Sequence, residues 1–205
     1  MPLQRKPLAR SPPAGLRTIS YGHEPMPRLF VALPLPEDVR ERLGLLAGGV
    51  PGARWVDPEN LHLTLRFIGE VDGGWAEDVI SALAGVSAKP FELTLAGVGH
   101  WGTRERANVI WAGVDKNPGL THLQSKIESA LVRLGLEPEG RKFSPHVTLA
   151  RLSGSPAARV AKFIADHNLF RLPPFKVTAF TLFSSFLSRG GAIYTPEVEY
   201  ALLGT

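Results

Sequence analysis

Polar and apolar residues alternate in two stretches of the chain that resemble each other. Residues 61–67 read Leu-His-Leu-Thr-Leu-Arg-Phe, and residues 145–151 read Pro-His-Val-Thr-Leu-Ala-Arg. Alternation with a period of two is typical of a strand with one buried face, so each His shares a face with the Thr two positions later. The pattern therefore predicts two equivalent strands, whose histidines, His62 and His146, are 84 residues apart.

Other stretches show the periods of strands and helices. Strands are expected at residues 29–33, 53–56, 91–98, 108–114, 175–186 and 192–202. Apolar residues at helical spacing predict helices over residues 75–86 and 118–134, a helix from Pro36 that ends at Gly48, and one from Ser155 to about Asn168. Residues 100–107 are expected to form a polar loop that carries Trp101.

The order of these elements predicts the fold class. Strands and helices mix without strict alternation, which favours an α+β fold with antiparallel pairing over a doubly wound parallel sheet. The order strand, helix, strands, helix, strand occurs once before residue 100 and again after it. With the repeated motif, it predicts two pseudo-symmetric lobes of mostly antiparallel sheet, with helices outside and both motif strands in a central groove. Residues 27–205 are expected to form this single two-lobed domain.

The net charge of +4 is concentrated in residues 1–28, which contain five basic residues and one acidic residue. The neutral remainder argues against a wide nucleic-acid footprint, which needs many contacts from Lys and Arg to phosphates. Residues 1–26 are predicted to be a disordered basic extension, with a targeting peptide as the alternative. No apolar run approaches the roughly 20 residues that span a bilayer, so we expect a cytoplasmic location without membrane contact.

The two motifs point to acid–base chemistry. An imidazole titrates near neutrality, so one His can take a proton from water while the other protonates an oxygen that leaves phosphorus. The hydroxyls of Thr64 and Thr148 can hold phosphoryl oxygens or orient the histidines. A single His-x-Thr is most often structural, but its duplication favours a functional role. The chain has no Cys, and its Asp and Glu lack ligand spacing, so we expect no metal and no cofactor.

With these motifs the chain resembles the two-histidine phosphoesterases, and in particular their bacterial and archaeal RNA 2′,3′-cyclic phosphodiesterase, or 2′-5′ RNA ligase, branch. The resemblance covers about residues 27–203. The flanking residues that fit this branch are 28–32, Trp55-Val56, 67–71, 143–145, 182–185 and Tyr194. The resemblance implies the same two-lobed fold.

The resemblance also implies roles for individual residues. His146 would accept a proton from water, which attacks the cyclic phosphate, and His62 would donate a proton to the departing O3′. The product would then carry a 2′-phosphate. Thr64 and Thr148 would hold the non-bridging oxygens, and Arg151 matches the position of a phosphate-binding Arg.

Further candidates come from the residues themselves. Arg66 shares the face of His62 by strand alternation, and it either enters the groove or forms a salt bridge with Glu70 at the rim. Aromatic rings stack on bases, which makes Trp101, Tyr194 and Phe30 candidates for base or ribose contact, although core packing is favoured for Phe30.

Three functional hypotheses remain open from the sequence. The first is metal-independent hydrolysis of RNA 2′,3′-cyclic phosphate ends by a monomer with no protein partner. The second is a related activity in the same groove, which is 2′-5′ ligation of RNA or hydrolysis of small cyclic nucleotides. The third is a non-catalytic RNA-binding module anchored by the basic extension, which deletion of residues 1–25 would distinguish, because a binder should then lose most of its affinity.

Overall fold

The computed structural model of the chain describes residues 28–103, 106–188 and 191–203. The predicted basic extension of residues 1–26 lies outside the described residues. None of the described helices is long and apolar enough to cross a membrane.

A single hydrogen-bonded sheet runs through both lobes in the strand order β10-β9-β1-β3-β7-β6-β5, and all of its pairings are antiparallel. The first lobe contains β1 (Arg28–Pro34), β3 (His62–Glu70), β9 (Ala179–Ser188) and β10 (Gly191–Ala201). The second lobe contains β5 (Leu95–Gly102), β6 (Ala107–Val114), β7 (His146–Leu152) and β2 (Ala53–Trp55), which pairs with β7. The lobes join where Leu63 of β3 pairs with Val147 of β7.

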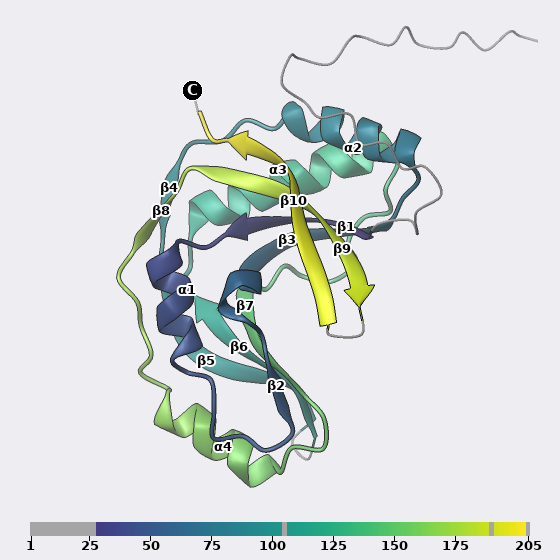
Figure 1. The fold of residues 1–205 in the computed structure, drawn as a ribbon. Helices are drawn as coiled ribbons and strands as arrows, with labels where there is room; N and C mark the ends of the chain where they lie inside the picture. Colours follow the sequence, from purple (N-terminus) through teal and green to yellow (C-terminus); the bar gives the residue numbers. More distant parts are fainter. Residues whose placement is uncertain (1–27, 104–105, 189–190, 204–205) are drawn as a thin grey trace, which may run out of the picture.

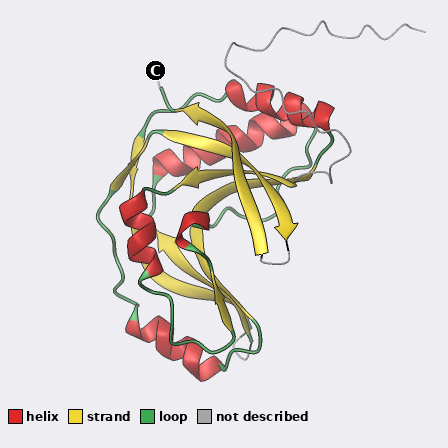
Figure 2. Ribbon diagram, viewed as in Figure 1, coloured by secondary structure: helices red, strands yellow, loops and turns green. Residues whose placement is uncertain are grey.

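Helices cover the outer face of each lobe (Figures 1 and 2). Four α-helices and one short 3₁₀ helix are described: α1 (Glu37–Gly44), η1 (Pro58–Asn60), α2 (Gly73–Ala84), α3 (Pro118–Leu134) and α4 (Ala157–Asp166). Helices α2 and α3 lie side by side over the first lobe, and α4 lies beside β5 at the opposite end of the molecule. Asp72 and Asn117 cap α2 and α3 by accepting a backbone N–H three residues later, at 2.9 Å in both cases.

The predicted α+β class, with two pseudo-symmetric lobes of antiparallel sheet, is confirmed. The lobes are not the two halves of the chain, however. Strand β2 precedes the first motif strand but pairs with β7 of the second lobe, and the C-terminal hairpin of β9 and β10 returns to pair with β1. Both lobes therefore need residues from each half of the chain, which fits a single domain.

Two predicted strands are each divided in two. The stretch 91–98 forms β4 (Phe91–Leu93) and the start of β5, and the stretch 175–186 forms β8 (Phe175–Val177) and most of β9. Strands β4 and β8 pair with each other in a separate two-stranded sheet. The breaks fall at Thr94 and Thr178, which are 84 residues apart like the motif histidines. Alternation alone did not reveal the breaks, because both sides of each break keep a strand pattern.

Two further expectations need correction. The loop predicted for residues 100–107 is too long, because β5 runs to Gly102 and β6 begins at Ala107, which places Trp101 on a strand. Helix α1 ends at Gly44 rather than at Gly48, since Gly48 and Gly49 have positive φ angles and belong to the following loop.

Candidate active site

The first residues of β3 and β7 bring the two motifs together at the junction of the lobes. Because these strands are antiparallel and pair at Leu63 and Val147, His62 lies opposite Thr148, and Thr64 lies opposite His146. Leu63 and Val147 are fully buried, whereas all four motif side chains are half-buried on the opposite side of the sheet. We call this side, which carries His62, Thr64, His146 and Thr148, the histidine face.

Both imidazoles are held in the same way. Nδ1 of His62 lies 2.7 Å from the carbonyl oxygen of Asn60, and Nδ1 of His146 lies 2.8 Å from that of Ser144. A carbonyl oxygen can only accept, so Nδ1–H is the donor in each case. Nε2 of each neutral ring then carries a lone pair, and Nε2 of each protonated ring carries a proton. The two histidines are therefore equally able to act as a base or as an acid.

The surroundings of the imidazoles favour their neutral forms. Burial lowers the pKa of His62 below its usual value, although the hydrogen bond to Asn60 opposes this, and the nearby charges of His146 and Arg151 lower the pKa further. Burial also lowers the pKa of His146, against the effect of its hydrogen bond to Ser144. The surroundings of both rings thus act in the same direction and favour the unprotonated imidazole.

These shifts predict an acidic optimum for kcat/KM. Acid–base catalysis needs one imidazole protonated and the other neutral, and both pKa values in the free protein lie below the ordinary 6.5. The protonated partner is lost as the pH rises through these lowered values, so kcat/KM should peak below about pH 6.5. A pH series of initial rates checks this, with the exposed His122→Gln variant as the control whose profile stays unchanged. A plateau of kcat/KM that extends above pH 7.5 would contradict the prediction.

Each motif strand bulges at the leucine that follows its Thr. In β3, Thr64 pairs with Ala32 and Arg66 with Val31, so Leu65 is the extra residue. In β7, Thr148 pairs with Trp111 and Ala150 with Ile110, so Leu149 is the extra residue. A bulge of one residue exchanges the two faces for the residues after it. Arg66 and Phe67 in β3 and the residues after Leu149 in β7 consequently point to the sides opposite to those that simple alternation predicts.

The bulge in β3 removes Arg66 from the site. Its side chain is 9% exposed and forms an ion pair with Glu128 of α3 at 2.6 Å, and a second one with Glu139 at 3.5 Å. It also donates to the backbone oxygens of Phe67 and Glu137. The prediction that Arg66 binds phosphate is therefore wrong, and so is its alternative, because Glu70 pairs with Arg28. Arg66 anchors β3 to α3 on the helix-covered side.

The bulge in β7 turns Arg151 toward the histidine face. Arg151 pairs with Val109 and Thr148 pairs with Trp111, and these partners are two residues apart on β6, so Arg151 shares the face of Thr148. The equivalent residue of the first motif is Phe67, which is 62% exposed and lies 6.0 Å, between ring centroids, from Phe30. The two halves of the site are thus chemically different, with a guanidinium on one side and an exposed aromatic ring on the other.

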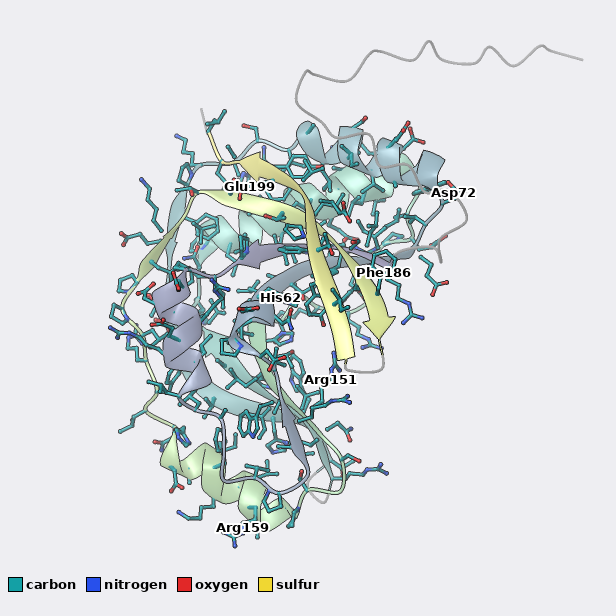
Figure 3. All side chains as sticks on the ribbon, viewed as in Figure 1. His62, Asp72, Arg151, Arg159, Phe186 and Glu199 are labelled. Atoms are coloured by element: carbon teal, nitrogen blue, oxygen red, sulfur yellow. The ribbon has the colours of Figure 1, made fainter. Side chains whose placement is uncertain are left out.

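Arg54 is a site residue that the sequence did not indicate. It pairs with Arg151 across β2 and β7, and directly opposite residues in a sheet project from the same face. Both side chains are exposed, and within the described part of the chain neither forms an ion pair. Two adjacent cations without an acidic partner favour an anion at this end of the histidine face. Figure 3 shows Arg151 at this end.

Aromatic rings surround His62. Its ring lies 5.0 Å from that of Phe30 and 5.1 Å from that of Tyr194, and Phe183 stacks on Phe30 at 5.3 Å. Phe30 is only 3% exposed, so it supports the imidazole, as the favoured core-packing interpretation predicts, and offers no free surface for the alternative contact with a base. Tyr194 contacts His62 edge-on and is half-buried, and its contact with a base or ribose stays a prediction.

Tryptophans flank His146 on the other side of the site. Trp101 meets the His146 ring edge-on at 4.2 Å and is 39% exposed, which leaves it able to contact a ligand. Trp111 lies 5.6 Å from Trp101 and pairs with Thr148. Its indole crosses β5 over Gly99, where a Cβ atom would collide with the ring. Sequence analysis missed Trp111 as a site residue, because its pattern is that of any strand residue.

The described residues contain no group of three or more His, Asp or Glu side chains that could hold a metal ion. The hydroxyls of Thr64 and Thr148 form no hydrogen bond with other residues in the described ranges. They can therefore donate to an anion between the two imidazoles.

Comparisons with known proteins agree with this site. The family model described as LigT like Phosphoesterase matches residues 33–111 and again residues 113–194, so each match contains one motif. An RNA 2′,3′-cyclic phosphodiesterase of Escherichia coli is 37% identical over 185 residues, which cover 85% of this chain and 96% of that protein. One of Geobacillus stearothermophilus is 35% identical over 128 residues, which cover 60% of this chain but only 41% of that protein.

A solved structure confirms the relationship at the level of the fold. The crystal structure of E. coli LigT complexed with 3′-AMP superimposes with a TM-score of 0.70 at 34% identity, covering 88% of this chain and 99% of that one. Two motif strands meet at the junction of two lobes, and the family model matches most of the chain in both halves. The chain therefore belongs to the LigT-like phosphoesterase family.

Proposed function

We propose that this protein hydrolyses RNA 2′,3′-cyclic phosphate ends to 2′-phosphomonoesters by acid–base catalysis with two histidines. The observation that carries the proposal is the symmetric pair of imidazoles, each fixed through Nδ1 and each leaving Nε2 for proton transfer. The names of the relatives supply the substrate class, since several relatives are RNA 2′,3′-cyclic phosphodiesterases.

The proposed reaction assigns one proton transfer to each histidine. Nε2 of His146 takes a proton from water as the water oxygen bonds to phosphorus. The bond between phosphorus and O3′ breaks, and Nε2 of His62 gives its proton to O3′. The phosphate remains on O2′. The next cycle begins when His146 has released its proton to solvent and His62 has taken one up.

Thr64, Thr148 and Arg151 would hold the non-bridging phosphoryl oxygens. The hydroxyls lie opposite the histidines, and the guanidinium supplies a fixed positive charge where negative charge develops. A bound phosphate would help His62 to act as the donor. In the free protein Arg151 disfavours the imidazolium form of His62, and a bound phosphate anion neutralises this effect and raises the pKa again.

A short RNA that ends in a 2′,3′-cyclic phosphate tests the proposal. Incubation with the protein in excess EDTA should give a 2′-phosphate, identified by phosphorus NMR, at the rate seen without EDTA. An RNA with the same sequence and a 3′-phosphate end is the control and should not change. A 3′-phosphate product would reverse the leaving group, and absence of turnover with bound RNA would contradict the enzymatic proposal.

The same assay addresses the basic extension. A protein that lacks residues 1–25 should keep its turnover if the histidine face is the functional site. Absence of turnover in the full chain, with loss of most RNA affinity and of its salt dependence on deletion, would instead favour the non-catalytic RNA-binding alternative. The cytoplasmic location and the monomeric state stay predictions.

A further inference from the structure

A cavity of about 470 Å³ adjoins His62 on the first lobe. Its apolar wall includes Pro34, which pairs with His62, and Phe183, whose ring centroid lies 6.3 Å from that of His62. Its polar lining includes Thr181, Glu197 and Glu199. The volume lies in the range of small-ligand sites, and an apolar wall with a few polar groups is typical of them.

The strand register places this cavity on the histidine face. Thr64 pairs with Ala32, Ala32 with Thr181, and Thr181 with Glu199, so these residues form one row across β3, β1, β9 and β10. With neighbouring strands about 4.8 Å apart, the row spans about 14 Å from Thr64 to Glu199. Glu197 is the extra residue of a bulge between Pro196 and Val198. The cavity therefore begins at Pro34, the pairing partner of His62, and ends at the two carboxylates.

The polar groups of the cavity are free to bind a ligand. Thr181 is 3% exposed, and its hydroxyl forms no hydrogen bond with the residues that the structure describes. Within the same residues, Glu197 and Glu199 form no ion pair and accept no hydrogen bond. A buried hydroxyl and two carboxylates without partners favour a ligand with N–H groups.

The charges on the histidine face give a bound RNA a direction. Arg151 and Arg54 lie on one side of His62, and Glu199 lies on the other (Figure 3). The phosphates that precede the terminal nucleotide are attracted to the arginines and repelled by the carboxylates. The part of the terminal nucleotide that can enter the acidic cavity is the uncharged base.

We propose, on the basis of the function proposed above, that this cavity binds the base of the terminal nucleotide and selects bases with an exocyclic amino group. The carboxylate of Glu197 or Glu199 accepts a hydrogen bond from the amino group. The hydroxyl of Thr181 donates to a ring carbonyl, and Phe183 packs against the ring. Cytosine and uracil have the same size, but cytosine presents N4–H₂ where uracil presents O4, which a carboxylate repels.

Two RNAs that differ only in the terminal base test the inference. Both end in a 2′,3′-cyclic phosphate, one on cytidine and one on uridine. The wild-type protein should hydrolyse the cytidine end with a kcat/KM on the order of 10-fold higher, since a hydrogen bond to a charged group contributes about this much. The doubly substituted Glu197→Gln/Glu199→Gln variant should bring the ratio close to one, because an amide can donate to O4 as well as accept. The single variant that does the same identifies the accepting carboxylate.

Two further variants separate the roles of the cavity residues. Glu77→Gln removes the same charge from exposed helix α2 and should leave the ratio at its wild-type value. Thr181→Val should raise KM for both RNAs by a similar factor, because both bases carry the carbonyl at C2. Thermal unfolding of each variant verifies that it is folded.

The outcomes distinguish this inference from the function on which it rests. Equal hydrolysis of both RNAs by the wild-type protein would overturn the inference and leave the proposed function intact. A preference that survives both Glu substitutions would also overturn it. Absence of hydrolysis of either RNA would overturn the proposed function, and the inference with it.

Discussion

Substitution of either His62 or His146 by alanine is expected to lower kcat by about 10²- to 10⁴-fold, the range for loss of one general acid or base. Each imidazole is half-buried and held by a single hydrogen bond to the backbone, so both variants should fold. Single-turnover rates on an RNA with a 2′,3′-cyclic phosphate end measure the effect. The double variant should lose little more than either single one, because residues that act as a unit are strongly non-additive.

A modified substrate assigns the acid and the base. A cyclic phosphate with sulfur in place of O3′ has a leaving group that needs no proton. It should restore much of the rate of the His62→Ala variant and none of that of the His146→Ala variant. If the rate of the His146→Ala variant were restored instead, His146 would be the acid and His62 the base. If both variants lost the same rate with the oxygen and the sulfur substrate, the assignment of one imidazole as acid and the other as base would be contradicted.

Arg151→Met is expected to lower kcat by about 10²-fold without a change in thermal stability. Arg66→Met should instead lower the stability and leave kcat unchanged. Arg151 is exposed, and its charge stands beside His62, so its loss affects the stabilisation of the reacting phosphate. Arg66 is almost completely buried between β3 and Glu128 of α3. The same chemical change is thus made at two arginines that occupy nearly equivalent sequence positions on opposite faces.

The stability effect of Arg66→Met follows from the charge that it leaves behind. Loss of one member of a buried ion pair costs about 3–5 kcal/mol, and less when the partner reaches solvent, so we expect about 2 kcal/mol here. Urea unfolding measures the free energy, and initial rates at saturating RNA measure kcat. A large loss of kcat in folded Arg66→Met would show that the β3 bulge does not separate this residue from the chemistry.

Local patterns were sufficient for the elements that depend on one segment alone. Helix α3 occupies the predicted residues 118–134, because its apolar spacing, its N-terminal Pro and its closing Gly135 are all local signals. The His and Thr of each motif also face one side as predicted, since no bulge lies between these two residues in either strand. The duplication of this short motif was enough to indicate a two-imidazole site.

The sequence alone could not locate features that depend on strand pairing. A bulge exists only relative to a partner strand, so the exchange of faces after Leu65 and Leu149 was not visible in the alternation. This is why Arg66 was assigned to the site, whereas Phe67 and Arg54 were not. The pairing of β2 with the second lobe involves residues almost 100 positions apart, and local residue preferences do not encode such a contact.

By itself, the sequence determined the α+β class, the repeated strands and the histidines and threonines that define the site, because these follow from residue type and from periods of a few residues. The tertiary structure decided which cations and aromatic rings accompany those histidines. Strand register and the bulge in β7 place Arg54 and Trp111 on the same face as the predicted Arg151. The bulge in β10 and the pairing of β9 with β10 also form the cavity near His62 that Glu197 and Glu199 line. Each of these arrangements is fixed by contacts between distant segments, whose energies arise only when the whole sheet has formed.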